Sequence, residues 1–91
     1  MRLAVIGSRT FINQTLIYKY LDAFNSKCKV DAVVSGGAKG PDSIGESWAK
    51  QQNIPTKIFL PEWKIYGKSA GFRRNKDIIN FCDVVIAFLG W

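Results

Sequence analysis

Short apolar runs alternate with longer amphipathic stretches along this chain. Four mostly apolar runs, each followed by a glycine or a proline, cover residues 3–6, 30–35, 57–60 and 84–89. Continuous rather than alternating apolar character is typical of strands that are buried on both faces, as in a parallel sheet. The pattern therefore predicts four strands of a short, mainly parallel sheet.

The stretches between these runs have helical spacing. Apolar residues recur at positions 16, 17, 20, 21 and 24, which form one stripe along a helix. A second helix opens at Pro41, whose missing N–H costs nothing at that position. A third covers about residues 68–81. The residues expected to face the sheet from the second and third helices are Ile44, Trp48, Ala49, Ile78, Ile79 and Cys82.

The order of these elements predicts a Rossmann-like three-layer α/β/α sandwich with a four-stranded sheet and right-handed crossovers. The chain of 91 residues is expected to form one domain, residues 1–91. In an open parallel sheet, ligands bind beyond the carboxyl ends of the strands. The loops expected at that edge are residues 7–10, residues 35–40 and the segment after Leu60, and the helix that starts at Lys68 begins beside them.

The segment 35–42, Ser-Gly-Gly-Ala-Lys-Gly-Pro-Asp, is the most informative of these loops. Three glycines in five residues, between a buried strand and a helix, allow bare backbone N–H groups to face an anion such as phosphate. The alternative is that the glycines only form a tight turn and let the helix pack closely. The triplet 67–69, Gly-Lys-Ser, is not a P-loop, because Glu62 stands where that motif needs its first glycine.

Basic and polar side chains gather around the same predicted edge. Ser8 and Arg9 follow the first strand, and Arg73 and Arg74 belong to the first part of the third helix. Arginine binds phosphate oxygens in pairs, so either of these two arginines could hold a phosphate near the glycine loop. Asn75 shares a helix face with the apolar residues and is expected to point toward the sheet. Together these elements predict a site for an anionic ligand.

Aromatic and acidic residues near this edge have several interpretations. Trp63 and Tyr66 could stack on a base or pin the loop onto the core. Asp42 could cap its helix, bind a ribose hydroxyl or act as a base, and it is with Glu46 a weak candidate for catalysis. Asp83 is expected to fix the start of the last strand. Trp48 is assigned to the core.

Composition limits the chemistry further. The chain has 13 Lys and Arg against 7 Asp and Glu, and this net charge of +6 favours an anionic partner. The absence of histidine excludes Ser-His-Asp and Cys-His catalysis and imidazole zinc sites. Cys28 and Cys82 are expected to be free thiols. No apolar run reaches the roughly 20 residues of a membrane helix, and the apolar start is too short for a signal peptide. We therefore expect a cytoplasmic protein without a metal, a cofactor or a membrane partner.

Many of these residues recur, in the same order, in one known family. They are Gly7-Ser8-Arg9, Phe11, Ser35-Gly36-Gly37-Ala38, Gly40, Asp42, Trp48-Ala49, Pro61, Trp63, Gly67-Lys68, Ala70-Gly71, Arg74-Asn75, Asp83 and Ile86-Ala87-Phe88. The set resembles the YspA-like branch of the SLOG superfamily, which has Rossmann-like folds. That superfamily includes LOG phosphoribohydrolases, DNA-processing proteins of the DprA type and proposed sensors of nucleotide-derived signals.

The resemblance implies a ligand built from a nucleotide, a nucleoside phosphate or ADP-ribose. With Ser35 added from the glycine loop, the predicted ligand-binding residues are Gly7, Ser8, Arg9, Ser35, Gly36, Gly37, Asp42, Lys68, Arg74 and Asn75. Family chains normally continue past the equivalent of Gly90 with a second glycine-rich loop and a further helix. The Pro-Gly-Gly-x-Gly-Thr loop of the LOG enzymes and its following glutamate have no counterpart here.

Glycosidic cleavage needs a well-placed carboxylate, and the sequence offers no clear one. We therefore favour a non-catalytic sensor or sequestering protein for a nucleotide-derived molecule, in a bacterial cytoplasm or, for a viral protein, the host cytoplasm. The alternatives are a nucleoside-phosphate or nucleotide-sugar hydrolase that uses Asp42 or Glu46, and a DprA-like nucleic-acid-binding protein. An apolar sheet edge at residues 84–89 also favours a homo-oligomer.

Overall fold

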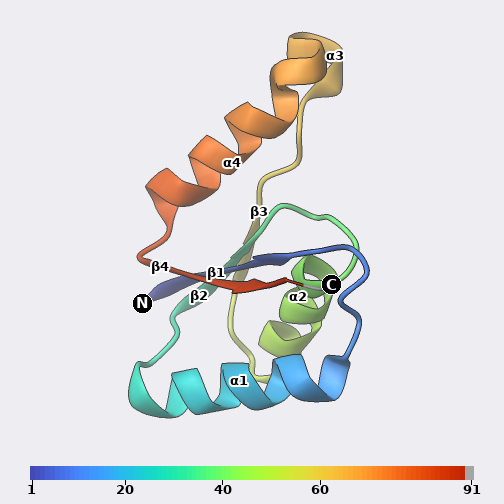
Figure 1. Ribbon diagram of the computed structural model, residues 1–91. Coiled ribbons are helices and arrows are strands. Elements are labelled where there is room, and N and C mark those ends of the chain that lie inside the picture. The colour runs from blue at the N-terminus through green and yellow to red at the C-terminus, as the bar shows by residue number, and fades with distance from the viewer. Residues whose placement is uncertain (90–91) are drawn as a thin grey trace.

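The computed structural model describes residues 1–89 and contains one four-stranded parallel sheet (Figure 1). Its strands are β1 (Arg2–Gly7), β2 (Ala32–Ser35), β3 (Thr56–Ile58) and β4 (Val84–Phe88). They lie in the order β3-β2-β1-β4, so the two central strands are β1 and β2. The predicted Rossmann-like α/β fold is confirmed. The predicted domain runs through Trp91, and its last two residues lie outside the described range.

Helices cover both faces of the sheet. Helices α1 (Gln14–Lys27) and α2 (Pro41–Gln51) lie on one side, and α4 (Ala70–Phe81) lies on the other (Figure 1). A short α3 (Trp63–Tyr66) and a 3₁₀ turn, η1 (Gly67–Ser69), precede α4. The third predicted helix therefore begins two residues later than expected, after a separate turn.

The larger part of the core lies between the sheet and the pair α1 and α2. Trp48 is fully buried there, as predicted, and its Nε1–H donates to Asp22 Oδ1 at 2.8 Å, which satisfies the indole. Helix α1 starts where the Asn13 side chain accepts the N–H of Leu16. Of the apolar stripe predicted on this helix, Tyr20 is 54% exposed, although its ring lies 6.3 Å from that of Phe88.

The core on the α4 side is small. It consists of Ala4, Val34 and Ile78, with Phe59, Phe81 and Cys82 packed against it. Helix α4 contacts β1 and β2 on this face. The prediction that Ile79 faces a buried layer is wrong, because its side chain is 65% exposed. The α4 face near β4 is therefore only partly covered.

Two of the four strands differ in burial from the prediction. All three residues of β3 are exposed, and Val85 of β4 is 43% exposed. Both strands lie at edges of the sheet, where a strand has one neighbour only. The runs at 57–60 and 84–89 were predicted to be buried on both faces, and this prediction is wrong for β3 and for the face of β4 that carries Val85 and Ala87.

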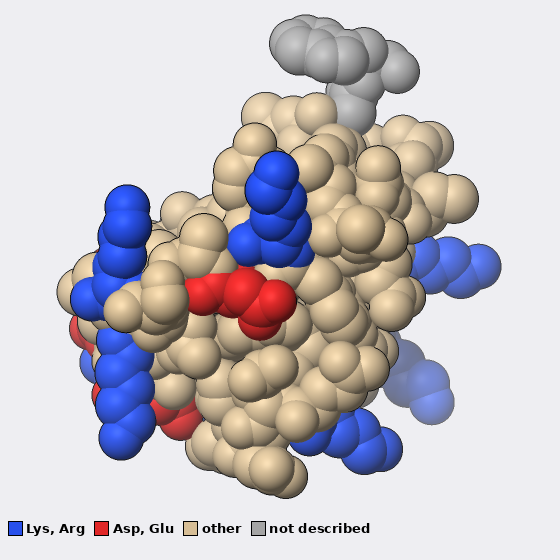
Figure 2. Space-filling view, turned by 90° about the horizontal axis from the view of Figure 1, so that it is seen from below, with Lys and Arg blue, Asp and Glu red and all other residues tan. Residues whose placement is uncertain are grey.

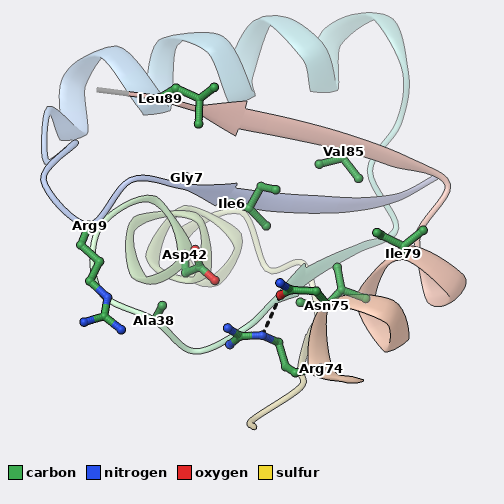
Figure 3. Close-up of a pocket in the computed structure, with 11 residues that line it drawn as sticks. Ile6, Gly7, Arg9, Ala38, Asp42, Arg74, Asn75, Ile79, Val85 and Leu89 are labelled. Atoms are coloured by element: carbon green, nitrogen blue, oxygen red, sulfur yellow. Dashed lines mark hydrogen bonds between the residues drawn. The ribbon is translucent and has the colours of Figure 1, made fainter. Parts of the chain in front are cut away.

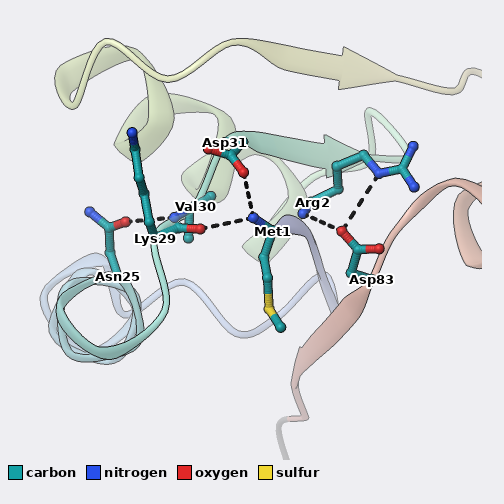
Figure 4. A network of polar contacts seen from close by, with 7 residues as sticks. All are labelled: Met1, Arg2, Asn25, Lys29, Val30, Asp31 and Asp83. Atoms are coloured by element: carbon teal, nitrogen blue, oxygen red, sulfur yellow. Dashed lines mark hydrogen bonds and ion pairs between the residues drawn. The ribbon is translucent and has the colours of Figure 1, made fainter.

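The amino ends of the strands are joined by polar contacts (Figure 4). Asp83 accepts the backbone N–H of Arg2 at 2.8 Å, and Arg2 Nε lies 3.6 Å from the same carboxylate. Asp83 thus holds the start of β4 against β1, as predicted. Nearby, the amino group of Met1 donates to Asp31, and this lowers the pKa of Asp31 below its usual value. These contacts lie at the edge opposite to the predicted site.

Candidate functional site

A cavity of about 500 Å³ lies where β1 ends, between α2 and α4 (Figure 3). Its volume is within the usual range of small-molecule sites. The residues that line it are Ile6, Gly7, Arg9, Ala38, Asp42, Arg74, Asn75, Ile78, Ile79, Val85 and Leu89. Its position at the carboxyl ends of parallel strands is the one expected for a ligand site in this fold.

The glycine loop is bound by side chains of its own chain. The N–H of Gly36 donates to Asp42 Oδ2 at 2.9 Å, and the N–H of Gly37 donates to Ser35 Oγ at 3.0 Å. The sequence predicted that such N–H groups would be free to face a phosphate. In the structure the Asp42 carboxylate takes that position at Gly36, so a phosphate in the same place would meet a negative charge.

Asp42 is a buried carboxylate at the wall of the cavity. Asp42 is only 5% exposed, and this burial raises the pKa of its carboxyl group above the usual value of 3.8. The Gly36 N–H, the charge of Arg74 and the Ala38 N–H oppose the shift, and Glu46 adds to it. Asp42 does not cap α2, whose N-cap residue is Gly40 with φ of 84°. Capping was the commonest role for such an aspartate, so the structure selects a different one.

Arg74 connects α4 to the glycine loop. Its Nη1 donates to the carbonyl oxygen of Gly36 at 2.6 Å, and its Nε donates to Asn75 Oδ1 at 2.9 Å. A guanidinium has five N–H donors, so three remain for a ligand. A Cβ at Gly36 would lie 2.5 Å from Arg74 Nη1, so an alanine there would force the guanidinium away from its present place on the loop. The missing side chain of Gly36 thus lets the Arg74 guanidinium reach the backbone of the loop.

The cavity has a polar end and an apolar end. Arg9 and Arg74 approach Ala38 from different elements, and Asp42 lies close by (Figure 3). The rest of the wall is apolar: Ile6, Ile79 and Val85 form the end away from Arg9, and Leu89 follows the strand that pairs with Gly7. The four apolar residues are absent from the predicted set. Strand alternation puts Ile6 and Val85 on one face, but only the position of α4 leaves that face open.

The predicted residues are only partly brought together. Gly7, Arg9, Asp42, Arg74 and Asn75 line one cavity, and Gly36 contacts both Asp42 and Arg74. Ser8 bonds to Thr10 at 2.9 Å, and exposed Lys68 belongs to η1. Neither lines the cavity.

The remaining candidates also lie apart from the cavity wall. Ser35 Oγ donates to Glu46 Oε2 at 2.6 Å, and neither residue lines the cavity. Trp63 and Tyr66 are 58% and 41% exposed and are also absent from its lining. The guanidinium carbon of Arg73 lies 4.1 Å from the centre of the Tyr66 ring. Arg73 therefore points away from the cavity that its neighbour Arg74 lines.

Residues 1–89 contain neither a candidate metal centre nor a candidate membrane span. No group of three or more acidic or cysteine side chains is arranged to hold a metal ion in this part of the chain. Within the same range, no helix has the length and apolar character needed to cross a membrane.

The fold and the cavity define a Rossmann-like α/β protein with a candidate ligand site at the carboxyl ends of its strands. The family described as "YspA, cpYpsA-related SLOG family" (YAcAr) matches residues 1–66, so the chain belongs to this family. It is also 32% identical over 94 residues to "Gene 61 protein" of Mycobacterium phage D29, across 96% of this chain and 75% of that protein. No solved structure gives a significant match. The family points to a nucleotide-related ligand.

Proposed function

We propose that this protein binds a nucleotide-derived, phosphate-bearing small molecule in the cavity described above, as a sensor or a sequestering protein. The main support is the convergence of Arg9 and Arg74, from two different elements, on one cavity beside β1. Arginine matches phosphate oxygens in charge and in geometry. The apolar end of the same cavity offers a surface for a base.

The position of Glu46 supports binding over turnover, because of the two candidate carboxylates only Asp42 lines the cavity. Glu46 accepts a short hydrogen bond from Ser35 and does not line the cavity. Asp42 accepts the N–H of Gly36. A hydrolase of this kind would need a carboxylate within reach of the departing group, free to exchange a proton.

On the face that carries α1, the distribution of charge supports a small ligand over a nucleic acid. On the side of the molecule where α1 lies, Lys and Arg project at several separate places, with uncharged and acidic surface between them (Figure 2). A protein that tracks a nucleic-acid backbone usually has a continuous basic stripe or groove. The basic groups that line the cavity, by contrast, are Arg9 and Arg74.

We also propose that the protein forms a homo-oligomer through the edge of β4. Within residues 1–89, β4 pairs with β1 on one side only, and its outer edge has no neighbouring strand. Exposed apolar edges favour pairing with another chain. Sedimentation of the purified protein tests this proposal, and a monomer at high protein concentration would contradict it.

Ligand binding is tested with a nucleotide panel. The protein is incubated with AMP, ADP, NAD, ADP-ribose, cyclic ADP-ribose forms, and cyclic di- and trinucleotides. Free ligand is removed, bound ligand is released by heating, and both fractions are identified by mass spectrometry. We expect one ligand to be recovered intact in stoichiometric amount. A cleaved product in the free fraction would instead indicate a hydrolase.

Two neighbouring arginines provide a matched pair of variants. Arg74→Ala should weaken binding at least about tenfold, which corresponds to about 1.4 kcal/mol. Arg73→Ala removes the same charge one residue away, but from a side chain stacked on Tyr66, and should leave the affinity unchanged. No bound ligand, or equal affinity in the two variants, would refute the proposed site.

A further inference from the structure

The polar end of the cavity contains two kinds of group that require different ligand chemistry. Asp42 supplies a buried carboxylate, and Arg9 and Arg74 supply guanidinium donors. Figure 3 shows the Asp42 carboxylate directed into the space that Ile6 and Arg74 border. An anionic ligand must therefore place its charge on the arginines and present another group to Asp42.

An ionised carboxylate only accepts hydrogen bonds. One oxygen of Asp42 already accepts the N–H of Gly36 at 2.9 Å, which holds the side chain in place from the loop side. A ligand group on the cavity side must donate a hydrogen bond to this carboxylate. A phosphate dianion has no proton to donate and is repelled, whereas the hydroxyl groups of a ribose donate readily.

The arginines provide the complementary position. Arg74 uses Nη1 and Nε within the chain, and its remaining donors are available at the cavity. Arg9 is exposed at the rim, and it forms no ion pair with residues 1–89. A phosphate on one side of a ribose could contact these two groups while the sugar contacts Asp42.

The apolar end suits the third part of such a ligand. Ile6, Ile79, Val85 and Leu89 offer dispersion contacts to a flat base. Asn75 accepts from Arg74 through Oδ1, and its amide N–H groups remain as donors next to this surface. The cavity therefore matches a base, a ribose and a phosphate in that order.

We infer that the unit recognised by this site is a ribonucleoside 5′-phosphate, with a ribose hydroxyl bound to Asp42 and the phosphate bound to Arg9 and Arg74. This inference rests on the proposed function and adds the orientation of the ligand. It also differs from the sequence-based expectation that the phosphate lies on the N–H groups of the glycine loop. The site is thereby predicted to select ribonucleotides over deoxyribonucleotides.

The test compares four small ligands with the intact protein. AMP, 2′-deoxy-AMP, 3′-deoxy-AMP and adenosine are titrated by ¹H–¹⁵N NMR, which measures affinities up to the millimolar range. At least one deoxy analogue should bind about tenfold or more weakly than AMP, because a buried polar group is left without its partner. Adenosine should lose affinity for lack of the phosphate.

Two variants assign each part of the ligand to its residue. Asp42→Asn keeps an acceptor for the Gly36 N–H but replaces a charge-assisted hydrogen bond with a weaker neutral one. The difference between AMP and its deoxy analogue should shrink in this variant. Arg9→Ala should instead shrink the difference between AMP and adenosine and leave the deoxy discrimination intact. The amide spectra of both variants report whether the fold is retained.

Each other outcome overturns the inference in a recognisable way. If AMP fails to bind while another member of the nucleotide panel binds, the recognised unit is wrong and the proposed function stands. The same holds if deoxy analogues bind as tightly as AMP, or if Asp42→Asn lowers their affinities equally. Stronger binding of all phosphates by Asp42→Asn would place the phosphate on the glycine loop. Both proposals fail if no nucleotide binds, or if Arg74→Ala and Arg73→Ala bind the ligand with equal affinity.

Discussion

The packing of α2 on β1 can be tested by replacing a helical glycine with alanine, and a second helical glycine provides the control. Gly45 lies in α2 against the sheet, and a Cβ there would lie 2.8, 2.9 and 3.1 Å from three carbons of the Val5 side chain. Val5 is fully buried and β-branched, so it cannot rotate away freely. Gly71 lies at the start of α4, where a Cβ would meet only Trp63 at an ordinary 3.8 Å.

The two substitutions to alanine should therefore have opposite effects. Replacing glycine with alanine in a helix stabilises it by about 0.5–1 kcal/mol. Gly71→Ala should show a gain of up to this size. Gly45→Ala gains the same amount but adds overpacking, which typically costs about 1–3 kcal/mol. The balance is a net loss of up to about 2.5 kcal/mol, and each kcal/mol lost lowers the melting temperature by about 4–8 °C in a domain of this size.

Urea denaturation of the wild type and both variants, followed by circular dichroism, measures these differences at constant temperature. The slope of the unfolding free energy against urea should be the same in all three proteins. If Gly45→Ala is as stable as Gly71→Ala, the close contact between α2 and β1 is not present and the position of Asp42 must be revised. A common decrease in both variants would contradict the account of Gly71.

Three further substitutions test the site and the ends of the sheet. Gly36→Ala puts a methyl group 2.5 Å from Arg74 Nη1 and should lower nucleotide affinity about tenfold. Its effect on the urea midpoint should be smaller than that of Gly45→Ala. Unchanged affinity would show that ligand binding does not need the contact between Arg74 and the glycine loop. Because the pKa of Asp42 is raised in the folded state, its contribution to stability is present below pH 3.8 and is lost as the pH rises through the folded-state pKa. The stability of the wild type relative to Asp42→Asn should therefore fall over that pH range. A constant difference in stability would refute the raised pKa. The Arg2 N–H lowers the pKa of Asp83 in the folded state. Asp83→Asn should therefore destabilise the protein at neutral pH, and this destabilisation should disappear as the pH falls below 3.8. Equal destabilisation at neutral pH and below pH 3.8 would contradict the lowered pKa.

The local pattern of the sequence determined the elements and the edge at which the candidate site lies. Apolar runs that end in glycine or proline predicted four strands, and the glycines and arginines after them marked the carboxyl ends. Trp48 was assigned correctly to the core because its helix spacing places it with Ala49 on the face toward the sheet. Asp83 was also assigned correctly, since a carboxylate before a strand readily accepts a backbone N–H. Such properties depend on neighbours in the sequence.

Only the tertiary structure decided which surfaces remain open. The exposure of Ile79 follows from the contacts that α4 makes with β1 and β2, and helix periodicity contains no information about this placement. The strand order likewise puts β3 and β4 at edges, although their apolar runs resemble that of β1. The sequence therefore predicted a polar site, but not the apolar end that completes the cavity.

The partners of the polar groups were also decided in three dimensions. Gly36 lies in the loop between β2 and α2 and donates to Asp42 six residues later, whereas its carbonyl accepts from Arg74 only because α4 is packed against the same sheet. From the sequence alone, the glycine loop either offers free N–H groups or forms a tight turn, and a helix cap is the commonest role for Asp42. The fold brings both the Asp42 carboxylate and the Arg74 guanidinium close to the loop, where Gly36 has no side chain to keep them away.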